Sequence, residues 1–220
     1  MIIIENRRKK RINILKKYPE GIIIDVTSKS DSKFQKLSPF YPVGDIPIPN
    51  SNELKSESVE GVWQGLKVFE NNGIDISRFS NTSMINLKRT VRSFGKPLGH
   101  RYGLNESTIL GYIEARIKIF IPAYIWVLNN KVQTLVHELK VLSEKKDLIL
   151  LDYEVNDDII NPLKPLSHAY LLKCHLEGNL PDSNELLNLH EIHKNDPKYQ
   201  KKENTIKEKI NKDNQFTLFN

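Results

Sequence analysis

The stretch Asp147-Leu-Ile-Leu-Leu-Asp152 is an apolar run bounded by two aspartates, and this pattern predicts a short inner strand. A second, β-branched run at Ile22–Val26 follows Pro19 and Gly21 and predicts a buried strand. Helical patterns surround the two runs, at about residues 58–71, 81–93, 107–129, 132–142 and 167–177. The sequence therefore predicts an α+β fold, a mostly helical single domain with a small sheet.

Prolines and glycines mark where these helices end. Residues 36–57 contain four prolines among several Ser and Asn residues, which predicts a long loop because proline is excluded from helix interiors. Asn72-Gly73 stands at the expected C-cap of the first helix. Pro122 predicts a kink or a junction within the 107–129 helix, and Gly178 ends the last helix.

Composition excludes several classes of function. The chain has 220 residues, with 33 Lys+Arg against 27 Asp+Glu and a formal charge of +6. Its one cysteine, Cys174, excludes a disulfide framework, a multi-cysteine zinc or iron–sulfur site and the zinc deaminases. No Walker-type or G-x-G-x-x-G loop is present, which argues against an NTPase or a dinucleotide oxidoreductase. His190 and His193 lack the zincin spacing, so we predict no metal and no cofactor.

The chain shows no sign of membrane insertion or export. No apolar stretch approaches the roughly 20 residues of a membrane-spanning helix. The apolar Ile2–Ile4 precedes the basic run Arg7–Arg11, the reverse of a signal peptide. We therefore expect a cytoplasmic protein without a membrane partner.

The two ends of the chain differ from its centre. Residues 5–17 carry seven basic side chains and form either a short helix with a solvated basic face or an arm that follows phosphates. Lys, Glu, Asp and Asn dominate residues 194–214, which predicts a charged helix or a flexible tail. We thus expect a basic arm or helix over 1–20, one main domain over 21–180 and a charged tail over 181–220.

The segment Ser58-Val-Glu-Gly-Val-Trp-Gln-Gly-Leu-Lys67 carries the most chemical information. Glu60, Gln64 and Lys67 stand at i, i+4 and i+7, so they share one face of the expected helix. A carboxylate, an amide and an ammonium on one face can form a solvated salt bridge. They can equally line a site, and the aromatic Phe40-Tyr41-Pro42 lies just upstream.

These residues resemble a known family. Phe40-Tyr41-Pro42, preceded by Ser38 and followed by Glu60-x-x-x-Gln64-x-x-Lys67, is similar to the opening signature of the NADAR (YbiA-like) family. The resemblance implies an N-glycosidase that cleaves the bond between a ribose carbon and a nitrogen. It implies as substrates phosphoribosylamino-pyrimidine intermediates or ADP-ribosylated guanine bases. The likeness spans about residues 22–178.

Later segments follow the same order and also depart from it. Gly99-His100-Arg101 falls where the family has a Gly-Arg pair, and Arg116 falls where it has a Lys-Phe pair. Asp152 stands at a functional Asp of the family, and residues 166–177 resemble its final core helix. The family usually continues its Asp with Trp-Gly, where this chain has Tyr153-Glu154. The chain therefore looks like a divergent branch of the family, and its substrate can differ.

The chemistry assigns roles to these residues. Cleaving a ribosyl C–N bond builds positive charge on the sugar and requires a proton on the leaving nitrogen. We expect Glu60 to stabilise that charge or to deprotonate water, and Asp152 to orient the ribose or to share the proton transfer. The expected substrate-binding residues are Lys67, Arg101 and Arg116 for phosphate, Phe40 and Tyr41 for the base, and Gln64, His100 and His168 as further members.

Structural alternatives exist for several of them. Phe40 can belong to the core, Arg116 can pair with Glu114, and Asp152 can cap the turn that follows it. His168 can donate a proton or cap its own helix. Both tryptophans, Trp63 and Trp126, are expected in the core and outside the site.

The last residues form a separate motif. Gln215-Phe-Thr-Leu-Phe219 is similar to the peptide by which bacterial DNA polymerases and repair factors dock on the sliding clamp, with Gln215, Leu218 and Phe219 as its contacts. Phe216 and Phe219 can instead fold back on the domain. Docking would favour a substrate on DNA. The alternative function is a non-catalytic, nucleic-acid-associated adaptor that is recruited through Gln215–Phe219 and the basic arm.

Overall fold

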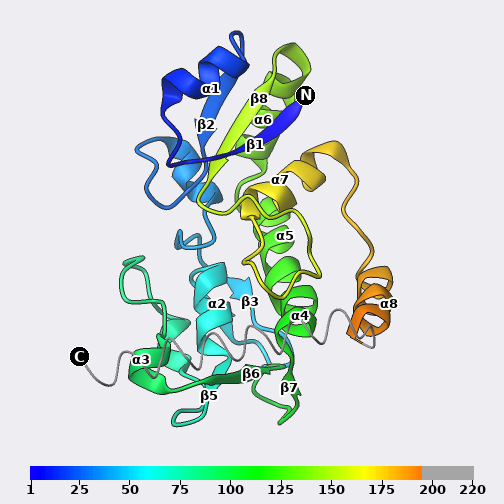
Figure 1. Cartoon of the computed structure of the whole chain (residues 1–220). Helices are drawn as coiled ribbons and strands as arrows, with labels where there is room; N and C mark the ends of the chain where they lie inside the picture. Colours follow the sequence, from blue (N-terminus) through cyan, green and yellow to red (C-terminus); the bar gives the residue numbers. More distant parts are fainter. Residues whose placement is uncertain (195–220) are drawn as a thin grey trace, which may run out of the picture.

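The structure is a computed structural model that describes residues 1–194 (Figure 1). A parallel sheet of order β1-β8-β2 lies at one end of the molecule. Its strands are β1 (Ile2–Asn6), β8 (Leu148–Asp152) and β2 (Ile22–Asp25). The prediction of an inner strand at 147–152 is confirmed, because β8 lies between the other two and residues 148–150 are fully buried.

The other two strands correct the expectations in part. The strand expected at Ile22–Val26 is present as β2, but it is an edge strand and only half-buried. Strand β1 was not expected, since residues 1–20 were interpreted as a basic arm or helix. Ile2–Ile4 instead pair with Leu148–Leu150 of β8. The basic residues that follow form α1 (Arg11–Lys17), a short helix that buries Ile14 and leaves its basic side chains exposed.

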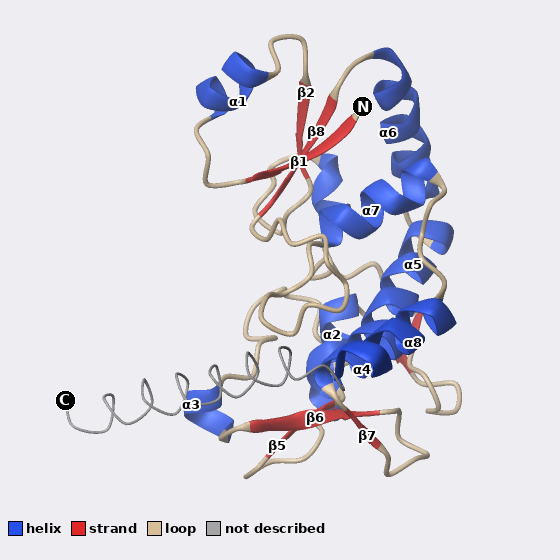
Figure 2. Cartoon of the chain, turned by 45° about the vertical axis from the view of Figure 1, so that its right-hand side comes forward, coloured by secondary structure: helices blue, strands red, loops and turns tan. Residues whose placement is uncertain are grey.

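Helices cover both faces of the parallel sheet. α6 (Gln133–Lys145) and α7 (His168–Glu177) lie on one side of the sheet and α1 on the other (Figure 2). α7 begins where the Ser167 hydroxyl accepts a hydrogen bond from the amide of Tyr170, and it ends at the left-handed Gly178. The predictions of helices at 132–142 and 167–177 are therefore confirmed.

A second, antiparallel sheet lies at the opposite end of the molecule (Figure 1). It consists of β5 (Lys67–Phe69), β6 (Pro97–Arg101) and β7 (Ile109–Leu110). The helix expected over 58–71 therefore stops early: α2 spans Val59–Gly65, and Lys67–Phe69 pair with β6. Ser58 caps α2 by accepting a hydrogen bond from the amide of Gly61.

The segments around this sheet contain short elements. The hairpin of β3 (Ile46–Pro47) and β4 (Lys55–Ser56) lies within the expected proline-rich loop, and η1 (Lys33–Leu37) leads into it. The helix expected over 81–93 is wrong, since that region holds only α3 (Val91–Phe94) after η2 (Ile76–Arg78). Met84 and Asn86 adopt positive φ there, a conformation that breaks a helix.

The long helix expected over 107–129 begins only at Tyr112, and its pitch changes in a π-helical turn. β7 occupies Ile109–Leu110, α4 spans Tyr112–Ala115, and a π-helical turn, η3 (Arg116–Phe120), leads into α5 (Ile121–Asn130). Pro122 stands in the first turn of α5 and has no N–H for the carbonyl of the preceding turn. The expectation of a junction at Pro122 is therefore confirmed, and the wider π turn is that junction.

The core joins the two ends of the molecule. Tyr124 of α5 is fully buried, and its hydroxyl donates a hydrogen bond of 2.8 Å to the carbonyl of Leu37. α8 (Ser183–Lys194) packs against η3 and α4 and buries Leu186. Within residues 1–194 the fold is α+β with helices in the majority and small sheets, as predicted. None of the described helices is long and apolar enough to cross a membrane.

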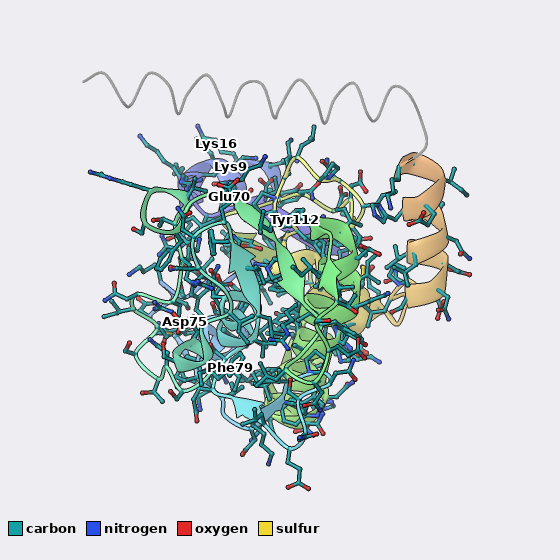
Figure 3. The ribbon with its side chains drawn as sticks, turned by 90° about the horizontal axis from the view of Figure 1, so that it is seen from below. Lys9, Lys16, Glu70, Asp75, Phe79 and Tyr112 are labelled. Carbon is teal, nitrogen blue, oxygen red and sulfur yellow. The ribbon has the colours of Figure 1, made fainter. Side chains whose placement is uncertain are left out.

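The close packing of α2 on η2 yields a stability prediction. A Cβ on Gly65 would lie 2.2 Å from the ring of Phe79, a residue labelled in Figure 3. Gly65→Ala should therefore lower the free energy of unfolding by about 1–3 kcal/mol, measured by urea denaturation. Gly73→Ala is the control, because its Cβ would meet open space. Equal stability of the two variants would contradict this packing.

Candidate active site

A cavity of about 640 Å³ lies at the carboxyl ends of the parallel strands. The segments that follow all three strands contribute to its wall: Arg8 after β1, Thr27 and Ser28 after β2, and Tyr153 after β8. Ligands of parallel sheets commonly bind at this edge, where the loops converge. The opposite wall comes from α2, β5 and the π turn. The site residues predicted from sequence that line the cavity are Phe40, Glu60, Gln64, Lys67, Arg116, Asp152 and His168.

Asp152 is held at the floor of this cavity by a dense set of donors. Its Oδ2 accepts hydrogen bonds from the Ser167 hydroxyl (2.8 Å), the Ala169 amide (3.3 Å) and Nδ1 of His168 (2.9 Å). Its Oδ1 accepts the amide of Tyr153 at 2.7 Å. Burial opposes its charge, but the charge and hydrogen bond of His168 hold the pKa of Asp152 at about 2. Asp152 is therefore an anion across the ordinary pH range.

His168 is the matching cation. Its Nε2 lies 2.9 Å from the carbonyl oxygen of Val26, at the end of β2, while Nδ1 faces Asp152. Both partners only accept hydrogen bonds, so both ring nitrogens carry a proton. Burial opposes this charge, yet Asp152 raises the pKa of His168 above its ordinary value. Because both nitrogens are engaged, the expectation of His168 as a proton donor does not fit, and Ser167 rather than His168 caps α7.

Glu60 is also buried, but its carboxylate has far fewer hydrogen-bond donors than that of Asp152. Its side chain comes from the first turn of α2, is 7% exposed and lines the same cavity as Asp152. Within residues 1–194, the one hydrogen bond to its carboxylate comes from Nε2 of Gln64, at 2.9 Å. Burial raises the pKa of the Glu60 carboxyl, against smaller opposing effects of Gln64 and of the charges of Lys88 and Lys67. Glu60 is thus the carboxylate that retains free hydrogen-bonding capacity.

Gln64 fixes the position of Glu60. Its amide group donates to Glu60, and its Oε1 accepts a hydrogen bond of 3.0 Å from the amide of Arg89. The Arg89 guanidinium in turn donates to the carbonyls of Lys67 and Gly73. This chain of bonds attaches the segment before α3 to α2 and β5. Gln64 is therefore a positioning residue for the carboxylate.

Three basic side chains on the cavity wall have neither an ion pair nor a side-chain hydrogen bond within the described residues: Arg8, Lys67 and Lys88. Lys67 lies on β5 rather than on the helix face expected for it, and burial lowers its pKa. Arg8 lies over the ring of Tyr153 at 5.2 Å, and Lys88 over the ring of Phe40 at 5.4 Å. The wall thus combines unpaired cations with aromatic rings, which suits an anionic aromatic ligand.

Comparison with known proteins identifies the family. A family of unknown function, DUF6939, matches residues 6–172, which include every element that lines the cavity. The chain belongs to the DUF6939 family. No curated protein and no solved structure matches it.

Three residues expected in the site of this DUF6939 chain are not part of the cavity wall: Tyr41, His100 and Arg101. Arg101 donates to the carbonyls of Glu106 and Leu104 and so fixes the turn before β7. His100 is buried behind Trp63. The expectation that Arg101 binds phosphate is therefore not supported by its contacts.

Arg116 lines the cavity of the DUF6939 chain, but its guanidinium is occupied. Nη1 donates to the carbonyls of Ile159 (2.6 Å) and Asn161 (3.0 Å), and Nη2 donates to that of Lys164 (2.9 Å). It does not pair with Glu114, whose carboxylate caps the amide of Gly111. Arg116 therefore holds the loop between β8 and α7 and has little capacity left for a phosphate.

Sequence reasoning missed several residues on this wall of the DUF6939 chain. Trp63 was expected in the core, yet it lines the cavity together with Tyr112 and Phe120. Arg8 lay within the basic run and Lys88 within a predicted helix, so neither stood out. A signal existed for Trp63, since it lies between Glu60 and Lys67 in the same short segment. The clamp motif residues Gln215, Leu218 and Phe219 lie outside the described residues.

Proposed function

We propose that this chain is an N-glycosidase that hydrolyses a ribosyl C–N bond in an ADP-ribosylated or phosphoribosylated base or nucleotide. One observation carries the proposal. Glu60 and Asp152, from opposite ends of the fold, line a single cavity that also holds unpaired cations and aromatic rings. The resemblance to the NADAR (YbiA-like) signature supports the same chemistry, because that signature contains Glu60.

The reaction requires a carboxylate near the anomeric carbon. As the C–N bond breaks, its electron pair moves to the base nitrogen and positive charge develops on the sugar. The ionised Glu60 stabilises that charge and takes a proton from the attacking water, while the leaving nitrogen takes a proton from solvent water. Glu60 then releases its proton to solvent and is ionised again. One water is consumed, and the products are a free base and a sugar with a new hydroxyl group.

Asp152 has a different part in this proposal. Its two oxygens already accept four protein hydrogen bonds, and its low pKa makes it a poor proton carrier. Asp152 instead forms a fixed anion–cation pair with His168 at its side of the cavity. We assign Asp152 to shaping the floor of the site through its pair with His168, and Glu60 to the chemical step.

The cations fit the phosphate groups of the proposed substrates. Arg8, Lys67 and Lys88 enter the cavity wall from three separate segments. Without carboxylate partners in residues 1–194, their charges are available to phosphate oxygens, which attract such groups strongly. The roles first assigned to Arg101 and Arg116 therefore pass to Arg8 and Lys88.

A direct assay tests the proposal. The full chain is incubated with ADP-ribosylated DNA, ADP-ribosyl guanosine and a phosphoribosylamino-pyrimidine, and the products are separated by liquid chromatography and identified by mass. We expect free base together with ADP-ribose or ribose phosphate from at least one of the three. Absence of release from all three would overturn the proposal.

The same assay addresses the adaptor alternative. That function would leave the substrates intact and would give DNA binding that weakens steeply with salt. The burial of Glu60 and its lack of an ion pair with Lys67 favour the enzyme, because a solvated salt-bridge face would expose both groups.

A further inference from the structure

His100 is buried in a setting that its own contacts do not explain. It is 2% exposed on β6, and neither ring nitrogen has a hydrogen-bond partner within residues 1–194. Buried polar atoms without partners destabilise a fold, so a histidine in this position calls for a role. Burial, with a contribution from Lys67, lowers the pKa of His100 to about 3, and the ring is therefore neutral.

Among residues 1–194, the one close aromatic neighbour of His100 that lines the cavity is Trp63. The two ring centroids lie 3.7 Å apart, with 32° between the ring planes. Trp63 lines the cavity and His100 does not. His100 therefore supports the indole from behind, and a ligand meets the indole on a side that His100 leaves open.

Two further rings complete an aromatic wall. Tyr112 and Phe120 both line the cavity, with centroids 5.9 and 5.8 Å from that of Trp63 and edge-on orientations of 67° and 78°. Tyr112, which is labelled in Figure 3, is 40% exposed. A cluster that packs rings closely yet leaves ring surface open to a cavity suits a flat, apolar ligand group.

We infer that Trp63, Tyr112 and Phe120 form the subsite for the base of the substrate, with Trp63 as the stacking platform and His100 as the residue that positions it. The inference rests on the proposed function and deepens it, since it assigns the base to one wall and leaves the cations Arg8, Lys67 and Lys88 for phosphate. Glu60 lies one helical turn before Trp63 on α2, so base and sugar can be held from the same helix.

The chain offers a spectroscopic test that does not depend on turnover. It has two tryptophans, and Trp126 of α5 is not part of the cavity wall. In the full-length Trp126→Phe variant, the fluorescence therefore comes from Trp63. We expect guanosine 5′-monophosphate to quench it saturably and ribose 5-phosphate to leave it nearly unchanged. Equal responses to the two probes would overturn the inference.

Substitutions at position 63 measure the stacking. Trp63→Leu should weaken binding of guanosine 5′-monophosphate about tenfold or more, in calorimetry, because stacking on an aromatic ring is lost. Trp63→Phe should retain affinity within about threefold, and ribose 5-phosphate should bind both variants as it binds the unmodified chain. Parallel weakening of both probes would assign Trp63 to general folding and overturn the inference.

Substitutions at position 100 test the positioning role. Since the imidazole is neutral, Phe keeps a flat ring behind the indole, whereas Leu does not. In the Trp126→Phe background, His100→Phe should preserve the emission maximum of Trp63 and the affinity for guanosine 5′-monophosphate. His100→Leu should shift the emission and weaken binding. Identical behaviour of the two variants would remove His100 from the subsite.

These outcomes separate the inference from the proposed function. Quenching of Trp63 by the nucleotide without release of a base in the glycosidase assay would support the subsite and overturn the glycosidase. Release of a base that is unaffected by Trp63→Leu, with no response of Trp63 fluorescence, would support the glycosidase and overturn the subsite.

Discussion

Replacing Glu60 with glutamine should lower kcat of the proposed hydrolysis by about 10²- to 10⁴-fold. The amide keeps the Oε1 acceptor for Gln64, which lies at 2.9 Å in the native chain, so the fold of α2 should persist. It removes the charge that stabilises the sugar cation and the group that takes a proton from water. The measurement is steady-state release of base, with thermal unfolding as a check on folding.

The pH profile of the native chain is a second test of the role of Glu60. Burial raises the pKa of Glu60, and the proposed role needs the ionised form. The kcat/KM should therefore rise with pH through a value above the ordinary range for glutamate. Glu144→Gln, on the exposed surface of α6, is the matched control and should be fully active. Undiminished turnover in Glu60→Gln would rule out the mechanism.

Replacing Asp152 with asparagine should reduce the free energy of unfolding by about 3–5 kcal/mol, because it leaves a buried imidazolium without its anion. One Asp152 oxygen serves three donors, and the other serves the amide of Tyr153. An amide group cannot accept at both positions, so a buried donor loses its partner in either orientation. Urea denaturation at pH 5 measures the loss.

The pH dependence of this loss follows from the two pKa shifts. Asp152 has a depressed pKa of about 2, so its contribution to stability is complete above the unfolded value of about 3.9 and is lost as the pH falls towards 2. His168 has a raised pKa, so its contribution is complete below the unfolded value of about 6.5 and is lost as the pH rises through the folded value. The difference between native and variant should be largest at about pH 4–6.5.

A neighbouring aspartate provides the control. Asp157 is exposed in the loop after β8, and Asp157→Asn should change the stability by no more than about 0.5 kcal/mol. If the effect of Asp152→Asn were equally small, or independent of pH, the buried ion pair with His168 would not stabilise the fold as described.

The elements with uniform local patterns could be predicted from the sequence. The run Leu148–Leu151 is apolar throughout and lies in the central strand. The segment that became α7 has a serine cap at Ser167 and ends at Gly178. The elements set by distant partners could not. β1 depends on pairing with β8, and Lys67–Phe69 leave the helical pattern because β6 offers hydrogen bonds to them.

The same distinction applies to the site. Glu60 stands out in the sequence by its spacing from Gln64 and Lys67, and Asp152 by its place in the resemblance to the NADAR (YbiA-like) family. Lys67 lines the cavity from a strand, although a helix face was the ground for choosing it. Arg101 and Arg116 were expected to bind phosphate, but backbone carbonyls that only the folded chain brings near occupy them. Trp63 was set aside because large aromatic residues usually fill cores.

The strand order β1-β8-β2 has a consequence for how the protein is made. β1 and β2 both pair with β8, so neither edge strand meets its partner until the ribosome has passed residue 152. β1 and β2 therefore remain unpaired in the nascent chain while most of the domain is synthesised. Such long-range strand pairings form slowly. The sheet, and with it the cavity floor, therefore assembles late in translation or after release, as one event that brings the beginning of the polypeptide to its later part.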